Sequence, residues 1–228
     1  MWNGKKKAIT FSYDDGVYQD KRLIEILNKN GLKATFNLNS ERFGIERIAT
    51  KDGRTAPANR IAREEIADVY SEHEVAVHTL THRRLPLLTD DEVIREVEQD
   101  RKNLSEIVGY DVVGMAYPCG GWQNSDRVER LIREHTGVKY ARVAASSFST
   151  AKQTNLYRFM PTVFHLDFEE SYVMLDEFLK SDDEGVFYIW GHSYEFDCLD
   201  KWDEFERFCE YLSKRDDVFY GTNKEVLL

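Results

Sequence analysis

The stretch Glu74-Val-Ala-Val-His-Thr-Leu-Thr-His82 carries two histidines four residues apart. Its first four residues form a short, valine-rich run, which predicts a buried strand that ends just before His78. In α/β folds, functional side chains gather at such strand ends. Two neutral imidazoles placed there predict a site for zinc or another borderline divalent metal. The spacing alone also fits one surface histidine beside one buried, hydrogen-bonded histidine.

A second polar cluster lies near the start of the chain. The run Lys7-Ala-Ile-Thr-Phe-Ser-Tyr13 predicts a strand, and Asp14-Asp15-Gly16 follows it directly. Adjacent carboxylates on a strand point to opposite faces, but at a fraying strand end both can reach one cavity. One carboxylate would then bind a metal while the other takes a proton from water. A simple Asp-Asp-Gly turn is the alternative.

Two later segments place further groups at strand ends. Gly185-Val-Phe-Tyr-Ile-Trp-Gly-His192 predicts a strongly apolar strand with His192 at its end, and Met160-Pro-Thr-Val-Phe precedes His165 in a similar way. Tyr117-Pro-Cys-Gly-Gly121 predicts a tight loop whose backbone N–H groups can face a developing oxyanion. We expect the substrate to contact Tyr117, Pro118, Cys119, His165 and Trp190. A core histidine, a plain turn and aromatic core packing are the alternatives.

Strand and helix signals alternate along the chain. Apolar periodicity, N-caps and C-terminal glycines predict helices at residues 19–30, 63–72, 89–108, 125–135, 169–180 and 202–214. Between them, strands are expected at 7–13, 33–38, 74–77, 139–144, 186–190 and 219–220, with a polar loop at 42–57 over the mouth of the site. This order predicts an α/β fold with a parallel sheet, closed or nearly closed, and active residues on its C-terminal rim.

Several motifs resemble those of one family. Thr10-Phe-Ser-Tyr-Asp-Asp-Gly16 and His78-Thr-Leu-Thr-His82 are similar to the signatures of the polysaccharide deacetylases, metal-dependent carbohydrate esterases with a NodB homology domain. Gly31-Leu-Lys-Ala-Thr-Phe-Asn37 resembles the second strand of that family, and Ile189-Trp-Gly-His192 resembles its Leu-x-x-His motif near the end. All of these segments occur in the right order. The resemblance implies a distorted (β/α) barrel with fewer than eight regular units.

The resemblance also implies a role for each matching residue. Asp14 would be the general base, and Asp15, His78 and His82 the ligands of one divalent metal ion, with zinc preferred. His192 would be the general acid that protonates the leaving amine, and the backbone N–H near Cys119 would stabilise the oxyanion. Three protein ligands would leave open the positions that a catalytic metal needs.

The third motif departs from the family pattern. Ala116 stands where the family has an arginine that orients the base, and Cys119 replaces an aromatic residue. Arg142 is a candidate substitute for the arginine. The carboxylate partner of the catalytic histidine is not evident either, and Asp167 and Glu195 are the candidates.

Composition narrows the class of protein. With 228 residues and 42% hydrophobic residues, the chain fits one catalytic domain spanning 1–228. A net charge of −10 argues against a nucleic-acid partner, and no apolar run is long enough to span a membrane. Three cysteines and no signal-peptide pattern predict a cytoplasmic location. The sequence leaves the oligomeric state open.

These observations together predict a metal-dependent hydrolase. Its expected reaction removes an acyl group, by preference N-acetyl, from an amino sugar or another small-molecule or oligosaccharide substrate. A hydrolase of a cyclic amide or imide on the same scaffold is one alternative. A catalytically inactive carbohydrate-binding domain is the other, because the third motif is eroded at Ala116 and Cys119.

Overall fold

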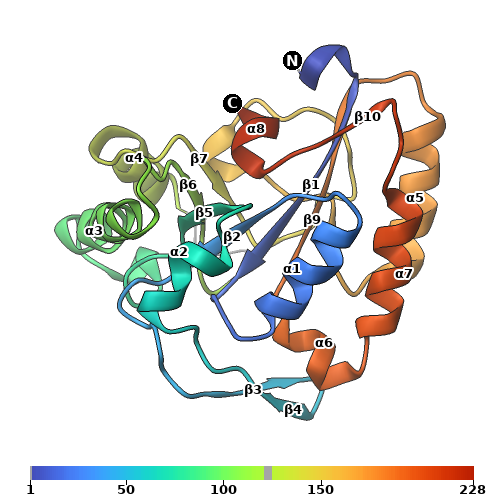
Figure 1. Cartoon of the computed structure of the whole chain (residues 1–228). Coiled ribbons are helices and arrows are strands. Elements are labelled where there is room, and N and C mark those ends of the chain that lie inside the picture. Colours follow the sequence, from blue (N-terminus) through green and yellow to red (C-terminus); the bar gives the residue numbers. More distant parts are fainter. Residues whose placement is uncertain (1, 121–124) are drawn as a thin grey trace.

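A curled parallel sheet forms the centre of the computed structural model, which describes residues 2–120 and 125–228 (Figure 1). The strand order is β7-β6-β5-β2-β1-β9-β8, and β10 pairs with β1. Its strands are β1 (Lys7–Asp14), β2 (Ala34–Leu38), β5 (Glu74–Val77), β6 (Gly114–Ala116), β7 (Tyr140–Arg142), β8 (Val163–Phe164), β9 (Gly185–Gly191) and β10 (Val218–Tyr220). All of their pairings are parallel, so their carboxyl ends meet at one rim.

The two outer strands of the sheet approach each other. Arg142 of β7 forms a parallel bridge with Phe159, which precedes β8 in the chain. The N–H of Val143 donates to the carbonyl of Phe159, and the N–H of Phe159 donates to that of Ala141, both at 3.0 Å. The sheet therefore curls into an incomplete barrel, which confirms the expected distorted barrel with fewer than eight regular units.

The helices cover the outside of the sheet (Figure 1). They are α1 (Asp20–Lys29), α2 (Ile66–Val69), α3 (Asp90–Val108), α4 (Asp126–His135), α5 (Phe168–Lys180), α6 (Tyr194–Leu199), α7 (Trp202–Leu212) and α8 (Asn223–Leu227), with 3-10 turns at η1 (Trp2–Gly4), η2 (Arg63–Glu65), η3 (Leu85–Leu87) and η4 (Leu156–Arg158). Thr89 and Glu92 form a capping box at α3, which ends at Gly109 with φ 75°. The α-helix at 63–72 is shorter than expected, because residues Arg63–Glu65 form the 3-10 turn η2 and α2 ends at Val69.

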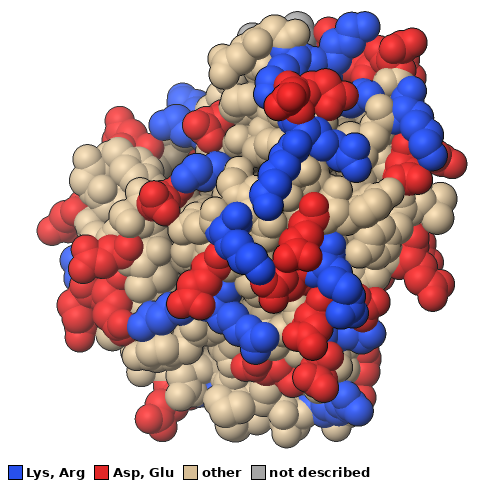
Figure 2. All heavy atoms as spheres, turned by 45° about the vertical axis from the view of Figure 1, so that its right-hand side comes forward, with Lys and Arg blue, Asp and Glu red and all other residues tan. Residues whose placement is uncertain are grey.

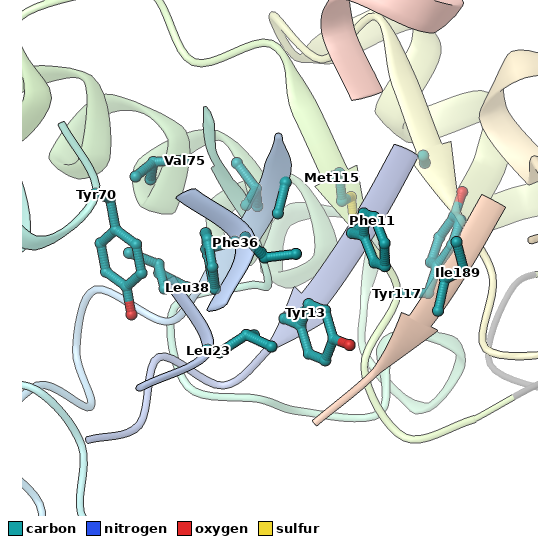
Figure 3. Close-up of a cluster of buried hydrophobic side chains, with 14 of the residues drawn as sticks. Phe11, Tyr13, Leu23, Phe36, Leu38, Tyr70, Val75, Met115, Tyr117 and Ile189 are labelled. Atoms are coloured by element: carbon teal, nitrogen blue, oxygen red, sulfur yellow. The ribbon is translucent and has the colours of Figure 1, made fainter. Parts of the chain in front are cut away.

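The main hydrophobic core lies between the sheet and these helices (Figure 3). Alternate residues of β1, namely Ile9, Phe11 and Tyr13, point into it. The rings of Phe36 and Tyr70 lie 4.7 Å apart, so β2 packs directly against the segment that follows α2. This packing fixes the position of β1, whose last residue is Asp14.

The inside of the barrel is polar. Thr10 donates to the Asn223 side-chain oxygen at 2.8 Å, and Thr35 donates to Glu74 at 2.7 Å. Tyr140 donates to the other oxygen of Glu74 at 2.8 Å. All of these side chains are buried, and α8 closes the end of the barrel opposite the rim through Asn223. Thr10, Ser12 and Asp14 alternate along β1 and thus belong to a hydrogen-bonded polar interior.

The prediction of a loop at residues 42–57 is wrong for the second half of that segment. An antiparallel hairpin forms there from the strands β3 (Ile48–Lys51) and β4 (Arg54–Pro57). Ala49 and Ala56 face inward and pack with Tyr194 and Cys198 of α6, while their neighbours are exposed. Small alternating alanines carry too weak a strand signal to stand out in a polar segment.

Charged side chains of both signs are mixed on the face that carries α5 and α7 (Figure 2). Lys29 of α1 pairs with Glu206 of α7 at 2.7 Å, and Asp176 pairs with Lys180 within α5 at 3.1 Å. On this face the acidic excess is therefore not gathered into one patch. No helix within the described residues combines the length and apolar character needed to cross a bilayer.

The two ends of the described chain meet at the closed end of the barrel (Figure 1). The indole N–H of Trp2 donates to the carbonyl of Val226 at 3.0 Å. Both residues belong to a small apolar cluster with Ala8 of β1 and Tyr188 of β9. This cluster lies at the start of the strands, whereas the predicted site residues lie at their ends.

Candidate functional site

The strand ends open onto a cavity of about 240 Å³. Its wall contains these residues that the sequence singled out: Asp14, Asp15, His78, His82, Tyr117, Cys119, Trp190 and His192. Asp14 ends β1, His78 follows β5 and His192 follows β9. Because the strands are parallel, side chains separated by more than a hundred residues meet at one rim.

Asp15, His78 and His82 form a cluster suited to a metal ion. One ligand atom from each lies within 4.8 Å of the others. Asp15 Oδ1 is 3.9 Å from His78 Nε2 and 3.7 Å from His82 Nε2. Two imidazole nitrogens and one carboxylate oxygen form a donor set typical of catalytic zinc. Within the described residues, this is the only such group of three.

Surrounding contacts prepare these ligands for a cation. His78 Nδ1 lies 2.9 Å from the carbonyl of Ala116, so this nitrogen carries the proton and Nε2 offers its lone pair. Burial lowers the pKa of His78, and burial together with His78 lowers the pKa of His82 to about 4. Both rings are therefore neutral near pH 7, which is the form that binds metals.

The backbone around the cluster is strained. Asp15, Thr79, His82 and Cys119 have φ values of 88°, 69°, 62° and 69°, in the left-handed region that non-glycine residues avoid. Thr79 is β-branched and fully buried, and its hydroxyl accepts a hydrogen bond from the N–H of His82 at 3.1 Å. Such strain concentrates at functional sites and is held there by the surrounding structure.

Asp14 is held by Arg142, which is completely buried. The guanidinium of Arg142 contacts Asp14 Oδ1, and the side-chain amide of Asn37 donates to the same oxygen at 2.9 Å. Burial alone would raise the pKa of Asp14, but the charge and hydrogen bond of Arg142, together with the charges of His78 and His192, outweigh it and hold this pKa below its ordinary value. Oδ2 faces the cavity, 4.0 Å from His78 Nε2 and 3.9 Å from His192 Nε2.

Arg142 reaches Asp14 from the strand next to the expected one. Ala116 on β6 and Arg142 on β7 are register partners. The structure thus places the guanidinium of the candidate Arg142 beside Asp14 although position 116 is alanine. Arg142 Nε also donates to Ser12 Oγ at 3.1 Å, which ties it to β1.

His192 is paired with Glu195, one of its two candidate partners. His192 Nδ1 lies 3.4 Å from Glu195 Oε2, and the N–H of His192 donates to the same oxygen at 3.3 Å. Burial would lower the pKa of His192, but the hydrogen bond and charge of Glu195 outweigh it and raise this pKa above its ordinary value. Asp167, the other candidate, instead precedes α5, and its N–H donates to the carbonyl of Phe164.

Two of the expected substrate contacts do not line the cavity: Pro118 and His165. His165 is buried behind His192, where its Nε2 lies 2.7 Å from Glu195 Oε2. Its ring packs on Phe196 with a centroid distance of 4.3 Å. His165 therefore contacts the carboxylate partner of His192 from the side of the sheet that the helices cover, where its ring also lies 5.6 Å from that of Tyr13. In the expected loop, Gly121 lies outside the described residues.

Two arginines near the metal cluster were not anticipated. Arg47 Nη1 donates to Asp15 Oδ2 at 3.0 Å, and Arg60 Nη2 donates to Asp15 Oδ1 at 2.9 Å. Burial alone would raise the pKa of Asp15, but Arg60 and the neighbouring histidines outweigh it and keep this carboxylate ionised. Neither arginine belongs to a periodic pattern, and the hairpin between them lies in the segment that the sequence predicts as a loop, so no local signal identifies them.

The chain was compared with protein families and solved structures. A family model described as polysaccharide deacetylase matches residues 2–141. A comparison with curated protein sequences gave no match. A family 4 carbohydrate esterase from Streptomyces lividans, in complex with acetate, is 12% identical with a TM-score of 0.57, over 96% of this chain and 93% of the esterase.

Two further structures share the fold. The peptidoglycan deacetylase PdaC from Bacillus subtilis is 15% identical with a TM-score of 0.58, over 98% of this chain and 90% of PdaC. A family 4 pseudoenzyme from Bacillus anthracis is 19% identical with a TM-score of 0.56, over 100% of this chain and 67% of that protein. At these identities the likeness establishes the fold.

Proposed function

The chain belongs to the polysaccharide deacetylase family, and on that premise we propose that it is a metal-dependent hydrolase of an N-acyl bond. The favoured substrate is an N-acetylated amino sugar or small glycoside. The observation that carries the proposal is the convergence on one cavity of Asp14, His192 and the cluster of Asp15, His78 and His82. All three parts are needed for water to attack an amide carbonyl.

Asp15, His78 and His82 would hold the metal ion, and zinc suits this donor set. When bound, a divalent metal polarises a carbonyl and makes water more acidic. The neutral imidazoles and the ionised carboxylate are already in the protonation states that binding requires. His78 is also fixed in the correct tautomer by the carbonyl of Ala116.

Asp14 and His192 divide the proton transfers between them. Arg142 and Asn37 bind Oδ1 of Asp14, which leaves Oδ2 directed at the cavity to accept a proton from the attacking water. Glu195 raises the pKa of His192 and so favours its protonated form, whose Nε2 can give a proton to the departing amine. A carboxylate base and an imidazolium acid that face the same cavity suit amide hydrolysis near neutral pH.

The size of the cavity limits what it can enclose. About 240 Å³ is below the ~300–1,000 Å³ of pockets that enclose drug-sized ligands. The acyl group and part of one ring would therefore enter, and the rest of the substrate would lie on the rim. Trp190 is half-buried at that rim and offers an aromatic face to a sugar. All three cysteines are free, in keeping with the cytoplasmic location proposed from the sequence.

Acetate release from N-acetylated mono- and oligosaccharides tests the proposal. The purified protein should bind zinc in a 1:1 ratio and release acetate, and a chelator should abolish the reaction reversibly. Asp14→Asn should lower kcat by about two orders of magnitude or more at unchanged zinc content. Full activity of Asp14→Asn, or activity that survives complete metal removal, would contradict the assigned roles.

An inactive carbohydrate-binding domain is the second candidate, and Ala116 favours it, since the usual position of the motif arginine is lost. The pseudoenzyme among the similar structures shows that this fold occurs without activity. Arg142 weighs against this candidate, because it supplies the guanidinium from β7. Sugar binding by calorimetry without turnover under any metal supplement would select the binding domain. Parallel assays with cyclic amides and imides would identify ring-opening activity instead.

A further inference from the structure

A cationic group pairs with each carboxylate of the site: Asp14 and Asp15, which line the cavity, and Glu195, the partner of His192. Arg142 pairs with Asp14, and Lys51 Nζ lies 3.3 Å from Glu195 Oε1. Asp15 has two such partners, Arg60 at 2.9 Å and Arg47 at 3.0 Å. A divalent cation that enters this cluster therefore meets ligands whose negative charge is compensated, and it is repelled by nearby guanidinium groups.

The two arginines that pair with Asp15 differ in how readily each could move away from it. Arg60 is 2% exposed at its side chain, and it donates to Oδ1, the oxygen that faces both imidazoles. Arg47 has a side chain that is 30% exposed, and it donates to Oδ2 on the opposite side. Arg60 would leave a buried charge unpaired if it moved, whereas the partly exposed guanidinium of Arg47 can turn into water and keep its charge hydrated.

The backbone of Arg47 is anchored while its side chain is not buried. Its N–H donates to the Asn59 side chain at 3.0 Å, and its carbonyl accepts from the N–H of Ala58 at 2.7 Å. The guanidinium lies over the ring of Tyr194, 5.3 Å from its centroid, at the wall of the cavity. The segment leading into the hairpin thus holds a positive charge against the second oxygen of the expected metal ligand.

We propose that Arg47 is a counter-ion that competes with the metal: it neutralises Asp15 in the metal-free protein and weakens metal binding. This inference rests on the metal site of the proposed function. A positive partner stabilises the ionised form of the buried Asp15 carboxylate, and in this way it stabilises the folded protein. A cation beside a ligand opposes a second cation, so removing Arg47 should strengthen metal binding and should destabilise the metal-free protein.

Zinc affinity of the intact protein, measured by competition with a chromophoric chelator, tests this directly. Arg47→Gln should bind zinc about tenfold more tightly than the wild type, the scale on which groups around a ligand tune affinity. Arg54→Gln is the matched control, since Arg54 is exposed on β4 of the same hairpin and the change removes the same charge. Its affinity should stay at the wild-type value.

Salt and thermal unfolding provide further readouts. The gain in Arg47→Gln should shrink as ionic strength rises, because Arg47 is partly exposed to solvent. Without metal, Arg47→Gln should have a lower Tm than the wild type. Saturating zinc should raise the Tm of Arg47→Gln by more than it raises the Tm of the wild type. Equal or weaker zinc binding by Arg47→Gln would overturn the inference while leaving the proposed function standing. A wild-type protein that binds no zinc would instead overturn the proposed function.

Discussion

Ala116 on β6 and Arg142 on β7 are register partners, and the guanidinium of Arg142 contacts the carboxylate of Asp14 on β1. The arginine thus reaches Asp14 across the interior of the barrel. Its side chain is completely buried, so the ion pair is shielded from water and salt. A buried pair of this kind is costly to break from one side only.

Arg142→Gln should lower the free energy of unfolding by about 3–5 kcal/mol, because it leaves the buried Asp14 without its counter-charge. The same substitution in an Asp14→Asn background should cost much less. Urea unfolding of the four proteins of this double-mutant cycle measures the difference. An equal cost in both backgrounds would show that Arg142 stabilises something other than Asp14.

The pH dependence of kcat should report the His192–Glu195 pair. The pKa of His192 is raised above its ordinary value, and the acid must be protonated, so kcat should fall as pH rises through this raised pKa. In Glu195→Gln this falling limb should move to lower pH. Asp203→Asn, which removes an exposed charge of nearby α7, should leave the limb in place. An unmoved limb in Glu195→Gln would mean that another group delivers the proton.

Asp20 should make stability depend on pH. It is buried, accepts a hydrogen bond from Tyr70 at 2.7 Å, and burial raises its pKa to about 7. The folded state therefore holds the proton more tightly than the unfolded chain. The stabilisation that this proton gives to the folded state is complete below about pH 4. It is lost as pH rises from there to about 7, at about 1.4 kcal/mol for each pH unit.

Asp20→Asn should flatten this part of the curve, as measured by urea unfolding between pH 4 and 8. Asp100, whose pKa burial also raises to about 7, should retain its own share of the slope. A slope that does not change in Asp20→Asn would place the proton elsewhere.

Gly191 should be intolerant of a side chain. A Cβ there would lie 2.4 Å from the ring of His165, which is held by its contact with Glu195. Gly191→Ala should therefore destabilise the protein by about 1–3 kcal/mol, as overpacking does. In Gly191→Ala/His165→Asn the smaller side chain should recover part of this loss in thermal unfolding. Strictly additive effects of the two substitutions would argue that the clash is relieved in another way.

Local patterns were enough to predict the fold class and most of the long elements. The apolar run before Asp14 and the Thr89–Glu92 capping box both appear where the sequence indicates. The family expected from the Asp14–Gly16 and His78–His82 motifs is confirmed by the family model. Each of these signals lies within a few residues of the chain, and a single sequence displays such signals directly.

Contacts that depend on strand register cannot be predicted from such local signals. Arg142 is 128 residues from Asp14, and the sequence offers it only as a candidate, because its contact with Asp14 depends on the pairing of β6 with β7. The position of His165 behind His192, and that of Arg47 and Arg60 at Asp15, likewise depend on tertiary packing. The sequence pattern places a residue at a strand end but does not say which neighbour it meets.

The hydrogen bond between Trp2 and Val226 has a practical consequence for experiments. It brings the first and last described segments together at the closed end of the barrel, away from the cavity at the strand ends. Affinity tags or surface-attachment groups at either end should leave the cavity accessible to substrate. A peptide linker joining the two ends should also allow circular permutants, with new termini opened at the exposed turn Asp52–Gly53 of the hairpin.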